Sequence, residues 1–365
     1  MKIALVHDFL REYGGAERVV EAMHEIWPEA PLYTSFVDWK ALGQHGARFK
    51  DWDIRPSWVQ RNWLVKKYHS PLRFLAPKIW ESFDLSGYDV VLSSSGWFMC
   101  RGVIVKKPAV HICYIHHPPR NLYGYATGSN LQKYWPVRVY ATIINFFLRH
   151  YDFETAQRVD HFVANSQETA RRVKKFYRRD STVIYPPVEI PNVKLKQKGD
   201  YFLSVGRLTY AKRVDLAIAA CNKLKLPLKI VGKGKEEVSL RSIAGPTIEF
   251  VGGVSDSELA RLYAGARACI FCALDEDFGM VPVESMGHGV PVIALGEGGV
   301  LETVTDGKTG ILFYKPTAES LISAMNKFEK TKFDANDCIS QAKTFNKERF
   351  KKELRNFVEE NIRRK

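Results

Sequence analysis

Residues 275–294 read DEDFGMVPVESMGHGVPVIA, a pattern that indicates a loop, a helix and a strand in succession. An apolar run that ends near Cys272 leads into this loop, which carries three consecutive acids and a glycine. We expect the helix to begin between Val281 and Glu284, because proline suits a first helical turn. The first N–H groups of a helix lack intrahelical acceptors and bind anions or hydroxyls. Glu276 in the loop and Glu284 in the helix can then contact two hydroxyl-bearing parts of one ligand, although a solvated acidic loop before a surface helix fits the same pattern.

On both sides of this segment, short apolar runs alternate with helix-length amphipathic stretches. Strands are expected at residues 3–6, 90–93, 112–115, 161–164, 201–205, 228–231, 247–251, 268–272 and 291–294. Helices are expected at residues 16–26, 169–177, 214–223, 256–264, 283–287 and 347–362. Strands that alternate with helices predict parallel sheets covered by helices on both faces. The fold class expected is therefore α/β.

A proline-rich segment at residues 186–191 divides the chain near its middle and precedes Lys194, Lys196 and Lys198. Prolines at this density interrupt both helices and strand ladders. We therefore expect an N-terminal Rossmann-like domain at residues 1–190 and a C-terminal Rossmann-like domain at residues 191–345. Doubly wound sheets bind ligands at the carboxyl ends of their strands, which predicts a central cleft that both domains face.

The composition limits the class of protein. The chain has 365 residues, 45% of them hydrophobic and 26% charged, which is typical of a globular protein. No apolar run approaches the ~18 residues of a membrane-spanning helix, and the opening residues look like a strand rather than a secretory leader. Six sparse cysteines in mostly apolar runs indicate cytoplasmic thiols. The net charge of +14 indicates an anionic partner, which can be a nucleic acid, a phosphorylated ligand or a membrane surface.

A pair of cations follows the first predicted strand of the second half. The strand ends at Gly206, and Arg207 and Lys212 come next. A planar guanidinium and a compact ammonium group at the end of a strand suit a pyrophosphate. Taken alone, such a pair is also common on a solvated surface.

Two segments of the first half lie at predicted strand ends. Gly14 and Gly15 open the first helix, where glycines let a phosphate approach backbone N–H groups. They do not form G-x-G-x-x-G, so a nicotinamide dinucleotide site has no support. His116 and His117 follow a buried strand, and because successive strand residues face opposite ways, one of them is expected to face a ligand. The alternative is a structural histidine.

These segments together resemble the retaining glycosyltransferases of family 4, which have the GT-B fold. Residues 276–284 match the family's E-x7-E signature, residues 298–304 and 307–310 its continuation, and residues 206–212 its Gly-Arg-Leu-x3-Lys site. The resemblance implies that the catalytic residues are His116, Arg207, Lys212 and Glu276. It implies that donor-binding residues are Gly14, Gly15, Phe278, Gly279, Met280, Val281 and Glu284. It also implies that residues 346–365 form a helix that packs back on the N-terminal domain.

The finer resemblance is to bacterial O-antigen-type mannosyltransferases that use GDP-mannose. Residues 84–91, 114–120, 163–166 and 183–188 carry it, while Asn121 departs from an aromatic residue of those relatives. It implies transfer of α-mannose with retention onto a lipid-linked or polysaccharide glycan, with no metal and no other cofactor. A UDP-sugar donor, for glucosyl or N-acetylglucosaminyl transfer, is the alternative. A nucleotide-sugar 2-epimerase shares the fold but lacks this E-x7-E register.

Spacings typical of metal or redox sites also occur but have weaker support. Cys269 and Cys272 lie inside an apolar strand run without a second pair, so we expect them in the core. Residues 51–53 and 275–277 have the Asp-x-Asp spacing of some metal-dependent glycosyltransferases. We interpret them as solvated acids, and no metal site is predicted.

Cations and aromatic residues are interleaved in the first half, which holds 26 Lys and Arg against 18 Asp and Glu in residues 1–190. Residues 101–150 contain no acid, and residues 58–80 combine tryptophans with lysines and arginines. This combination is typical of helices on anionic lipid, and also of single-stranded nucleic-acid binding. Because a lipid-linked acceptor requires contact with a membrane, we expect a cytoplasmic protein bound peripherally to the inner face of the cytoplasmic membrane, and no nucleic acid. A non-catalytic nucleic-acid-binding module is the alternative.

Overall fold

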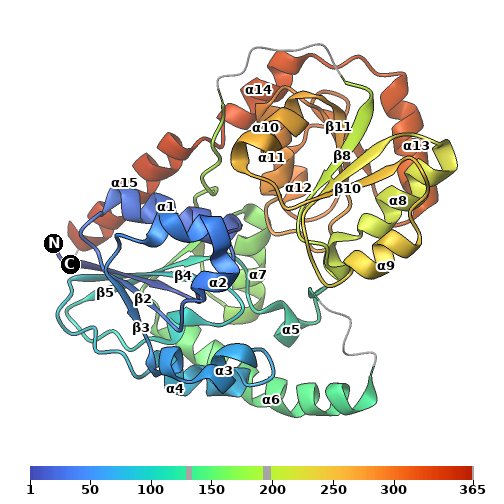
Figure 1. The fold of residues 1–365 in the computed structure, drawn as a ribbon. Coiled ribbons are helices and arrows are strands. Elements are labelled where there is room, and N and C mark those ends of the chain that lie inside the picture. Colours follow the sequence, from blue (N-terminus) through green and yellow to red (C-terminus); the bar gives the residue numbers. More distant parts are fainter. Residues whose placement is uncertain (129–133, 192–198, 364–365) are drawn as a thin grey trace. The chain divides into compact units, whose positions relative to one another are not determined.

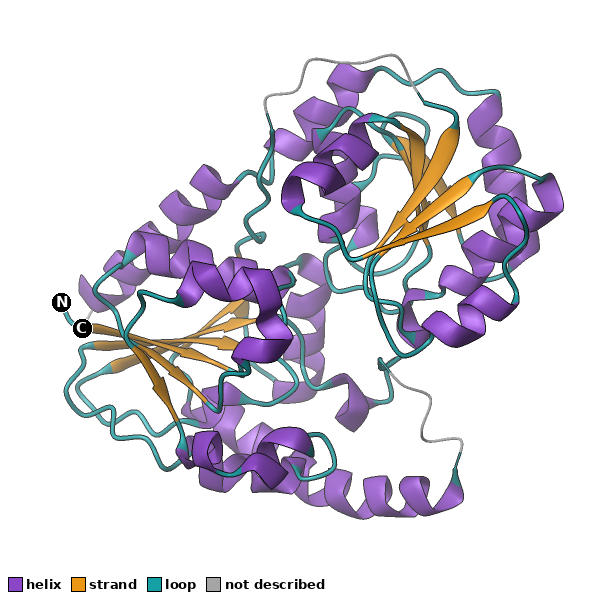
Figure 2. Cartoon of the chain, in the orientation of Figure 1, coloured by secondary structure: helices purple, strands orange, loops and turns teal. Residues whose placement is uncertain are grey.

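The computed structural model describes residues 1–128, 134–191 and 199–363, so Lys194, Lys196 and Lys198 lie outside the described residues (Figure 1). The chain forms two compact units. The first consists of the described residues of 1–125, 132–187 and 348–365, and the second of those of 126–131 and 188–347. Each unit contains one parallel sheet with helices on both faces (Figure 2). The prediction of two doubly wound α/β domains is therefore confirmed.

The first sheet has seven strands in the order β3-β2-β1-β4-β5-β6-β7. The central strands are buried throughout, as expected when helices cover both faces. The register pairs His7 of β1 with Ser94 of β4, and Ser95 of β4 with Ile115 of β5. The strands are β1 (Ile3–His7), β2 (Leu32–Thr34), β3 (Ile54–Pro56), β4 (Val90–Ser95), β5 (Val110–Ile115), β6 (His161–Ala164) and β7 (Ser181–Val183).

The helices of the first unit pack on the two faces of this sheet. Alternate strand residues divide between them, so that Ile3 and Leu5 enter one core cluster and Ala4 and Val6 the other. The first cluster includes residues of α1 (Gly15–Ile26) and α15 (Lys347–Arg363), and the second includes residues of α3 (Trp63–Lys67), α4 (Ala76–Trp80) and α6 (Trp135–Arg158). The remaining helices are α2 (Trp39–Leu42), α5 (Arg120–Tyr123) and α7 (Gln167–Tyr177), with 3-10 turns at Gly43–Phe49, Trp58–Arg61, Arg73–Leu75 and Cys100–Gly102.

The second sheet has six parallel strands in the order β10-β9-β8-β11-β12-β13. They are β8 (Tyr201–Val205), β9 (Leu228–Val231), β10 (Ile248–Gly252), β11 (Ala266–Phe271), β12 (Val292–Leu295) and β13 (Gly310–Phe313). The helices are α8 (Val214–Leu224), α9 (Glu237–Ser242), α10 (Asp256–Ala264), α11 (Met280–Gly287), α12 (Val300–Thr303), α13 (Ala318–Glu329) and α14 (Ala335–Lys343), and Tyr210–Lys212 form a 3-10 turn.

The helix α15 follows the second unit in sequence but belongs to the core of the first. Phe350, Leu354 and Val358 are fully buried there, at helical spacing on one face. The ring of Phe350 packs edge-on against Tyr114 of β5, with ring centroids 5.7 Å apart. The chain therefore returns from the second unit to the first between Lys347 and Glu348.

All six cysteines are buried free thiols. Cys269 and Cys272 lie in and just after β11, within the core of the second unit. Within the part of the chain that the structure describes, no helix is both long and apolar enough to span a bilayer.

Candidate active site

In the second unit, the loop between β11 and α11 carries Glu276, and contacts from neighbouring segments hold its backbone. The Asp275 N–H donates to the Glu297 carboxylate at 2.6 Å, and the Gly299 N–H donates to the Glu276 carbonyl at 2.9 Å. A Cβ atom at Gly298 would lie only 2.2 Å from the Glu276 carbonyl oxygen, and the φ of Gly298 is +60°. Residue 298 is therefore glycine because the loop passes directly over it.

The Lys212 ammonium group meets the Glu276 carboxylate at this loop, with 2.6 Å between Nζ and Oε2. Lys212 ends the 3-10 turn that follows β8, and Glu276 follows β11, the neighbouring strand. The adjacent carboxyl ends of two parallel strands thus bring together groups that are 64 residues apart. Both side chains stay partly exposed, at 25% for Lys212 and 14% for Glu276, so a ligand can still reach them.

Arg207 comes two residues after the end of β8 and is exposed to solvent. The 3-10 turn that starts at Tyr210 and ends at Lys212 lies between Arg207 and the Lys212 side chain in sequence. Two cations thus follow β8, of which Arg207 is exposed to solvent and Lys212 contacts Glu276. Such an arrangement suits a doubly charged phosphate group, for which the guanidinium provides a fork and the ammonium a point charge.

The helix α11 begins at Met280, immediately after this loop. Gly279 caps it with φ +90° and ψ +63°, a left-handed conformation that residues with a Cβ rarely adopt. Phe278 is buried and packs edge-on against Phe345, with ring centroids 5.3 Å apart. Residues Phe278, Gly279, Met280 and Val281 therefore form a fixed turn, whose first helical N–H groups lack intrahelical acceptors and favour an anion or a hydroxyl.

Glu284 lies in the second turn of α11 and is 9% exposed. The Tyr263 hydroxyl of α10 donates to its Oε2 atom at 3.1 Å. Tyr263 in turn stacks on His288, with ring centroids 5.0 Å apart, and His288 Nδ1 bonds the Glu284 carbonyl oxygen at 2.8 Å. One carboxylate oxygen is thus fixed by a tyrosine that the sequence analysis did not single out.

In the first unit, His116 directly follows β5 and is 9% exposed. Its Nε2 atom lies 2.7 Å from the Ser94 hydroxyl at the end of β4, and its carbonyl oxygen accepts from the Asn165 amide at 3.0 Å. His117 is more exposed, and its ring Nδ1 lies 3.0 Å from the carbonyl oxygen of the next residue. His116 therefore joins the polar cluster at the ends of β4 and β5 through the Ser94 hydroxyl.

The hydrogen bonds of Ser94 continue to His7 and Glu17. His7 Nδ1 lies 3.1 Å from the Ser94 carbonyl oxygen and 3.2 Å from its hydroxyl, and His7 Nε2 lies 3.5 Å from Glu17 Oε1. Burial lowers the pKa of His7, but the hydrogen bond and charge of Glu17, together with the charge of Asp8, outweigh it. The His7 pKa is therefore raised above its ordinary value of 6.5.

This chain of contacts connects the protonation of His7 to the state of His116. Below the His7 pKa both of its ring nitrogens carry protons, so Nδ1 donates to Ser94 and Nε2 to Glu17. When His7 Nδ1 donates to the Ser94 hydroxyl, that hydroxyl can donate in turn to Nε2 of His116. A neutral His116 ring that accepts at Nε2 carries its proton on Nδ1.

Gly14 and Gly15 begin α1 in the same unit. Gly14 is the N-cap residue, and its N–H donates to the Glu17 carboxylate at 2.8 Å. Its φ of −131° is open to any residue, so this turn does not itself require glycine. Glu17 thus contacts both the predicted glycine turn, at Gly14, and the ring of His7.

Asp8, the residue after β1, holds the loop that follows β4. Its carboxylate accepts the backbone N–H groups of Gly96, Phe98 and Cys100 at 2.9–3.0 Å. The side chain is 6% exposed. Asp8 therefore has a structural role next to the cluster, as an anchor for the segment that starts one residue after β4.

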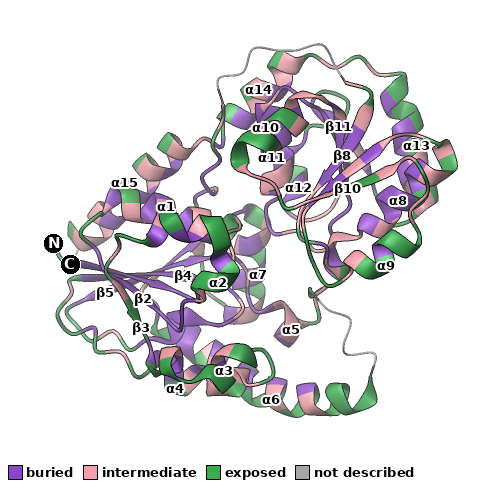
Figure 3. Cartoon of the chain, in the orientation of Figure 1, coloured by how far each residue is buried: buried purple, intermediate pink, exposed green. Residues whose placement is uncertain are grey.

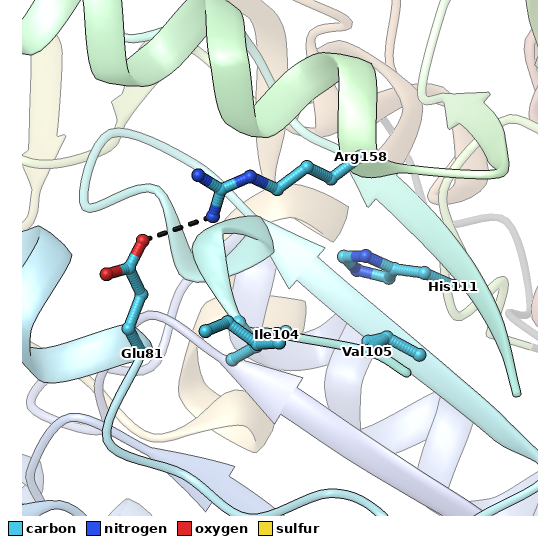
Figure 4. A pocket seen from close by; sticks show the side chains of 6 residues that line it. Glu81, Ile104, Val105, His111 and Arg158 are labelled. Atoms are coloured by element: carbon cyan, nitrogen blue, oxygen red, sulfur yellow. Dashed lines mark hydrogen bonds and ion pairs between the residues drawn. The ribbon is translucent and has the colours of Figure 1, made fainter. Parts of the chain in front are cut away.

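A cavity of about 370 Å³ lies at the other end of β5 (Figure 4). His111, the second residue of β5, lines it with Val103, Ile104, Val105 and the ion pair of Glu81 and Arg158, whose N···O distance is 3.1 Å. Burial lowers the pKa of His111 to about 4, so its ring is neutral at neutral pH. The cavity includes none of the predicted site residues.

The structure adds residues that the sequence analysis did not identify: Glu17, Ser94, Tyr263 and Glu297. No sequence signal pointed to them, since each acts through a neighbour that only the folded chain brings near. Across residues 1–128, 134–191 and 199–363, no three His, Cys, Asp or Glu side chains are grouped in a way that could hold a metal ion.

Two family models match the chain. Residues 13–190 match the model described as Glycosyltransferase Family 4, and residues 188–345 match Glycosyl transferases group 1. The curated relatives include a D-inositol 3-phosphate glycosyltransferase of Nocardioides sp., 28% identical over 44% of this chain and 43% of that protein. The Alpha-1,3/1,6-mannosyltransferase ALG2 of Mus musculus is 27% identical over 48% of this chain and 51% of that protein. The chain thus spans about half or less of the length of these relatives.

Solved structures share the whole fold. HepE of Anabaena in complex with UDP-glucose has a TM-score of 0.71 at 17% identity, covering 99% of this chain and 100% of that one. The lipopolysaccharide outer core galactosyltransferase WaaB has a TM-score of 0.68 at 17% identity, with the same coverage. At this identity the likeness concerns the fold, which is the GT-B type of two Rossmann-like domains.

Proposed function

Residues 13–190 match Glycosyltransferase Family 4 and residues 188–345 match Glycosyl transferases group 1, so the chain is a glycosyltransferase of this group. On that premise we propose that it transfers a hexose from a nucleotide sugar to a glycan acceptor with retention. The observation that carries the proposal is the polar group at the carboxyl ends of β8 and β11. Lys212, Glu276 and the start of α11 lie together there, with Glu284 one helical turn further on. These groups can bind a phosphate, a sugar and a ribose of one donor.

Each of these residues has a distinct proposed role. Glu276 accepts hydrogen bonds from the hydroxyls of the donor sugar, and Glu284 accepts them from the ribose. Its position on a fixed helix, with Tyr263 on one oxygen, leaves the carboxylate oriented before the nucleotide binds. The backbone N–H groups of residues 278–281 bind the sugar and the diphosphate.

Arg207 and Lys212 act as catalytic residues because the diphosphate gains negative charge when the sugar leaves. Cations that contact this charge in the transition state lower the barrier more than they strengthen ground-state binding. We propose a front-face reaction, in which the acceptor hydroxyl attacks the face from which the diphosphate departs. The leaving phosphate oxygen takes the acceptor proton, so no carboxylate nucleophile is needed.

In the first unit, His116 is proposed to contact the donor sugar, and Gly14 and Gly15 to let phosphate groups approach the backbone. Ser94 and His7 fix the ring of His116, which is consistent with a residue that must present one ring nitrogen to a ligand. The acceptor is proposed to be a lipid-pyrophosphate-linked or polysaccharide glycan. The enzyme would meet it at the inner face of the cytoplasmic membrane, and no nucleic acid takes part.

The proposed donor is GDP-mannose. The resemblance of residues 84–91 and 114–120 supports it, as does the mannosyltransferase among the curated relatives. A UDP-sugar is the second candidate, favoured by the UDP-glucose complex of HepE. No metal is proposed, so excess EDTA should leave turnover unchanged.

A thermal-shift panel of GDP, UDP and their sugar conjugates tests the donor, because a ligand stabilises the fold by RT ln(1 + [L]/Kd). The donor that stabilises most should also be hydrolysed slowly and consumed fully with an acceptor. A response to UDP-glucose alone would exclude GDP-mannose, and a response to none of them would contradict a nucleotide-sugar enzyme. NMR of the product gives the stereochemistry, since an inverted anomer would rule out retention.

A further inference from the structure

Large apolar side chains are exposed together on one side of the first unit, in two segments that we call the α3–α6 face. The first segment, residues 58–74, exposes Trp58, Trp63, Leu64, Tyr68 and Phe74. The second, the first half of α6, exposes Trp135, Val139, Ile143, Phe146 and Phe147. Trp135 is 70% exposed and Phe146 66%, and Figure 3 shows both segments largely in the colour of exposed residues. A gathering of this kind marks an interaction surface.

The first half of α6 carries apolar side chains on two opposite sides. Its buried residues Ala141 and Leu148 point into the unit, and Asn145 lies between them on the same side. At 100° per residue, the exposed residues 135, 139, 143, 146 and 147 lie roughly 180° away from that side. A helix that only covered a core would carry polar residues there. Packing within the first unit therefore does not account for the apolar side chains on the outer side of α6.

Contacts between the two segments make them one surface. The Arg73 guanidinium donates to the Asn145 side-chain oxygen of α6 at 2.8 Å. The Tyr140 hydroxyl of α6 donates to the Pro71 carbonyl oxygen. The segment that contains Phe74 therefore packs directly along the middle of α6.

The charges on this face are of one sign. Residues 58–74 contain Arg61, Lys66, Lys67 and Arg73 and no acid. Residues 135–147 of α6 contain Arg138 and no acid. Cations that flank exposed tryptophans and phenylalanines fit a surface that is anionic outside and apolar beneath, which is the structure of a bilayer with acidic lipids.

We propose that the α3–α6 face lies on an anionic lipid bilayer, with Trp63, Trp135, Phe146 and Phe147 entering the headgroup region and the flanking cations binding lipid phosphates. This proposal deepens the proposed function, since it names the surface through which the enzyme reaches a lipid-linked acceptor. It depends on the membrane part of that function and is independent of the donor.

The test is flotation of the full-length protein with vesicles of phosphatidylcholine, either alone or mixed with phosphatidylglycerol. We expect binding to the mixed vesicles that weakens as salt is raised, because the cations are exposed and screened. Tryptophan fluorescence should shift to shorter wavelength on binding, since Trp63 and Trp135 leave water.

The variant Phe146→Ser/Phe147→Ser tests the face itself. Each phenylalanine that enters the bilayer should contribute roughly tenfold or more to the partition constant, so the pair should reduce binding at least a hundredfold. The matched control is Val238→Ser/Tyr314→Ser, which removes two apolar side chains of the second unit that are 83% and 66% exposed. It should bind like the wild type, and both variants should keep the thermal transition because the altered side chains are exposed.

Three outcomes would overturn the proposal. One is no binding of the wild type to acidic vesicles at low salt. Another is equal binding of the two double variants. The third is a concentration-dependent dimer of the wild type that disappears in Phe146→Ser/Phe147→Ser, which would make a second copy the occupant of this face. Transfer to a water-soluble acceptor distinguishes these failures from failure of the proposed function, because that activity should be the same in both double variants.

Discussion

Replacing Lys212 by glutamine separates a catalytic role from a structural one. The substitution removes the ammonium group that lies 2.6 Å from Glu276 and keeps a side chain of similar length. Both members of the pair are partly exposed, at 25% and 14%, so water screens their attraction. An ion pair of this kind contributes about 1 kcal/mol or less to folding. For a unit of this size, that corresponds to a loss of about 2–4 °C in Tm.

The expected effect on catalysis is much larger. A cation that stabilises charge on a leaving diphosphate contributes about 2.7–4 kcal/mol to the transition state, so kcat should fall by ~10²–10³. A lysine that only holds the Glu276 loop in place would change kcat and Tm to a similar, small extent. The ratio of the two effects therefore decides between the roles.

The assay measures initial rates of sugar transfer at saturating GDP-mannose, with Tm determined by calorimetry on the same preparations. Lys229→Gln is the matched control, because Lys229 pairs with Glu249 at 3.1 Å in the same unit, away from the site. We expect the control to keep the wild-type kcat. A Lys212→Gln enzyme with kcat within a few-fold of wild type would refute the role, and a loss of Tm beyond ~10 °C would assign the lost activity to unfolding instead.

Three further predictions concern the first unit. Because Glu17 raises the pKa of His7, the pair stabilises the fold fully below pH ~6.5 and loses this effect as pH rises through the higher pKa of the folded state. The difference in unfolding free energy between the wild type and Glu17→Gln, measured by urea denaturation, should therefore become smaller between pH 6 and pH 9. Asp8→Ala removes the acceptor of three buried N–H groups and should destabilise the fold by about 3–5 kcal/mol in the same assay, whereas the exposed Asp84→Ala should keep a stability close to that of the wild type. Since burial lowers the pKa of His111 to about 4, the unfolding free energy of the wild type should fall as pH falls from about 6.5 towards 4. The variant His111→Gln should lose less over the same range. Equal slopes of unfolding free energy against pH would contradict the burial of a neutral ring.

The sequence predicted the fold class and most long elements, and the reason lies in their periodicity. Buried parallel strands such as β8 and β9 read as short apolar runs, and amphipathic helices such as α10 show a 3.6-residue period. The strands β2 and β3 have three residues each, which is too short for a period to appear. The helix α6 was not predicted because its buried side includes Asn145, Asp152 and Thr155 while large apolar residues are exposed on the other side, so no single apolar stripe stands out.

The residues of the candidate site were likewise only partly predictable from the sequence. Sequence spacing selected Lys212 and Glu276, and the structure places them in contact, although their catalytic role stays a prediction. Spacing could not identify Ser94, because it meets His7 only through the register of β1 on β4, 87 residues apart in the chain. Nor could spacing show that the His116 ring meets the Ser94 hydroxyl near the end of β4, 22 residues away in the chain.

The position of α15 affects how the protein is made. Residues 1–187 leave the ribosome long before Phe350, Leu354 and Val358 are synthesised, yet these three side chains fill the core of the first unit. The second unit, residues 188–347, is continuous apart from one short segment and can fold as it emerges. Until the second unit is complete, the nascent first unit therefore lacks the side chains that cover part of its apolar core, including Phe350 against Tyr114 of β5. The unit synthesised first is the last to finish folding, and a fragment that ends at residue 187 should be prone to aggregate.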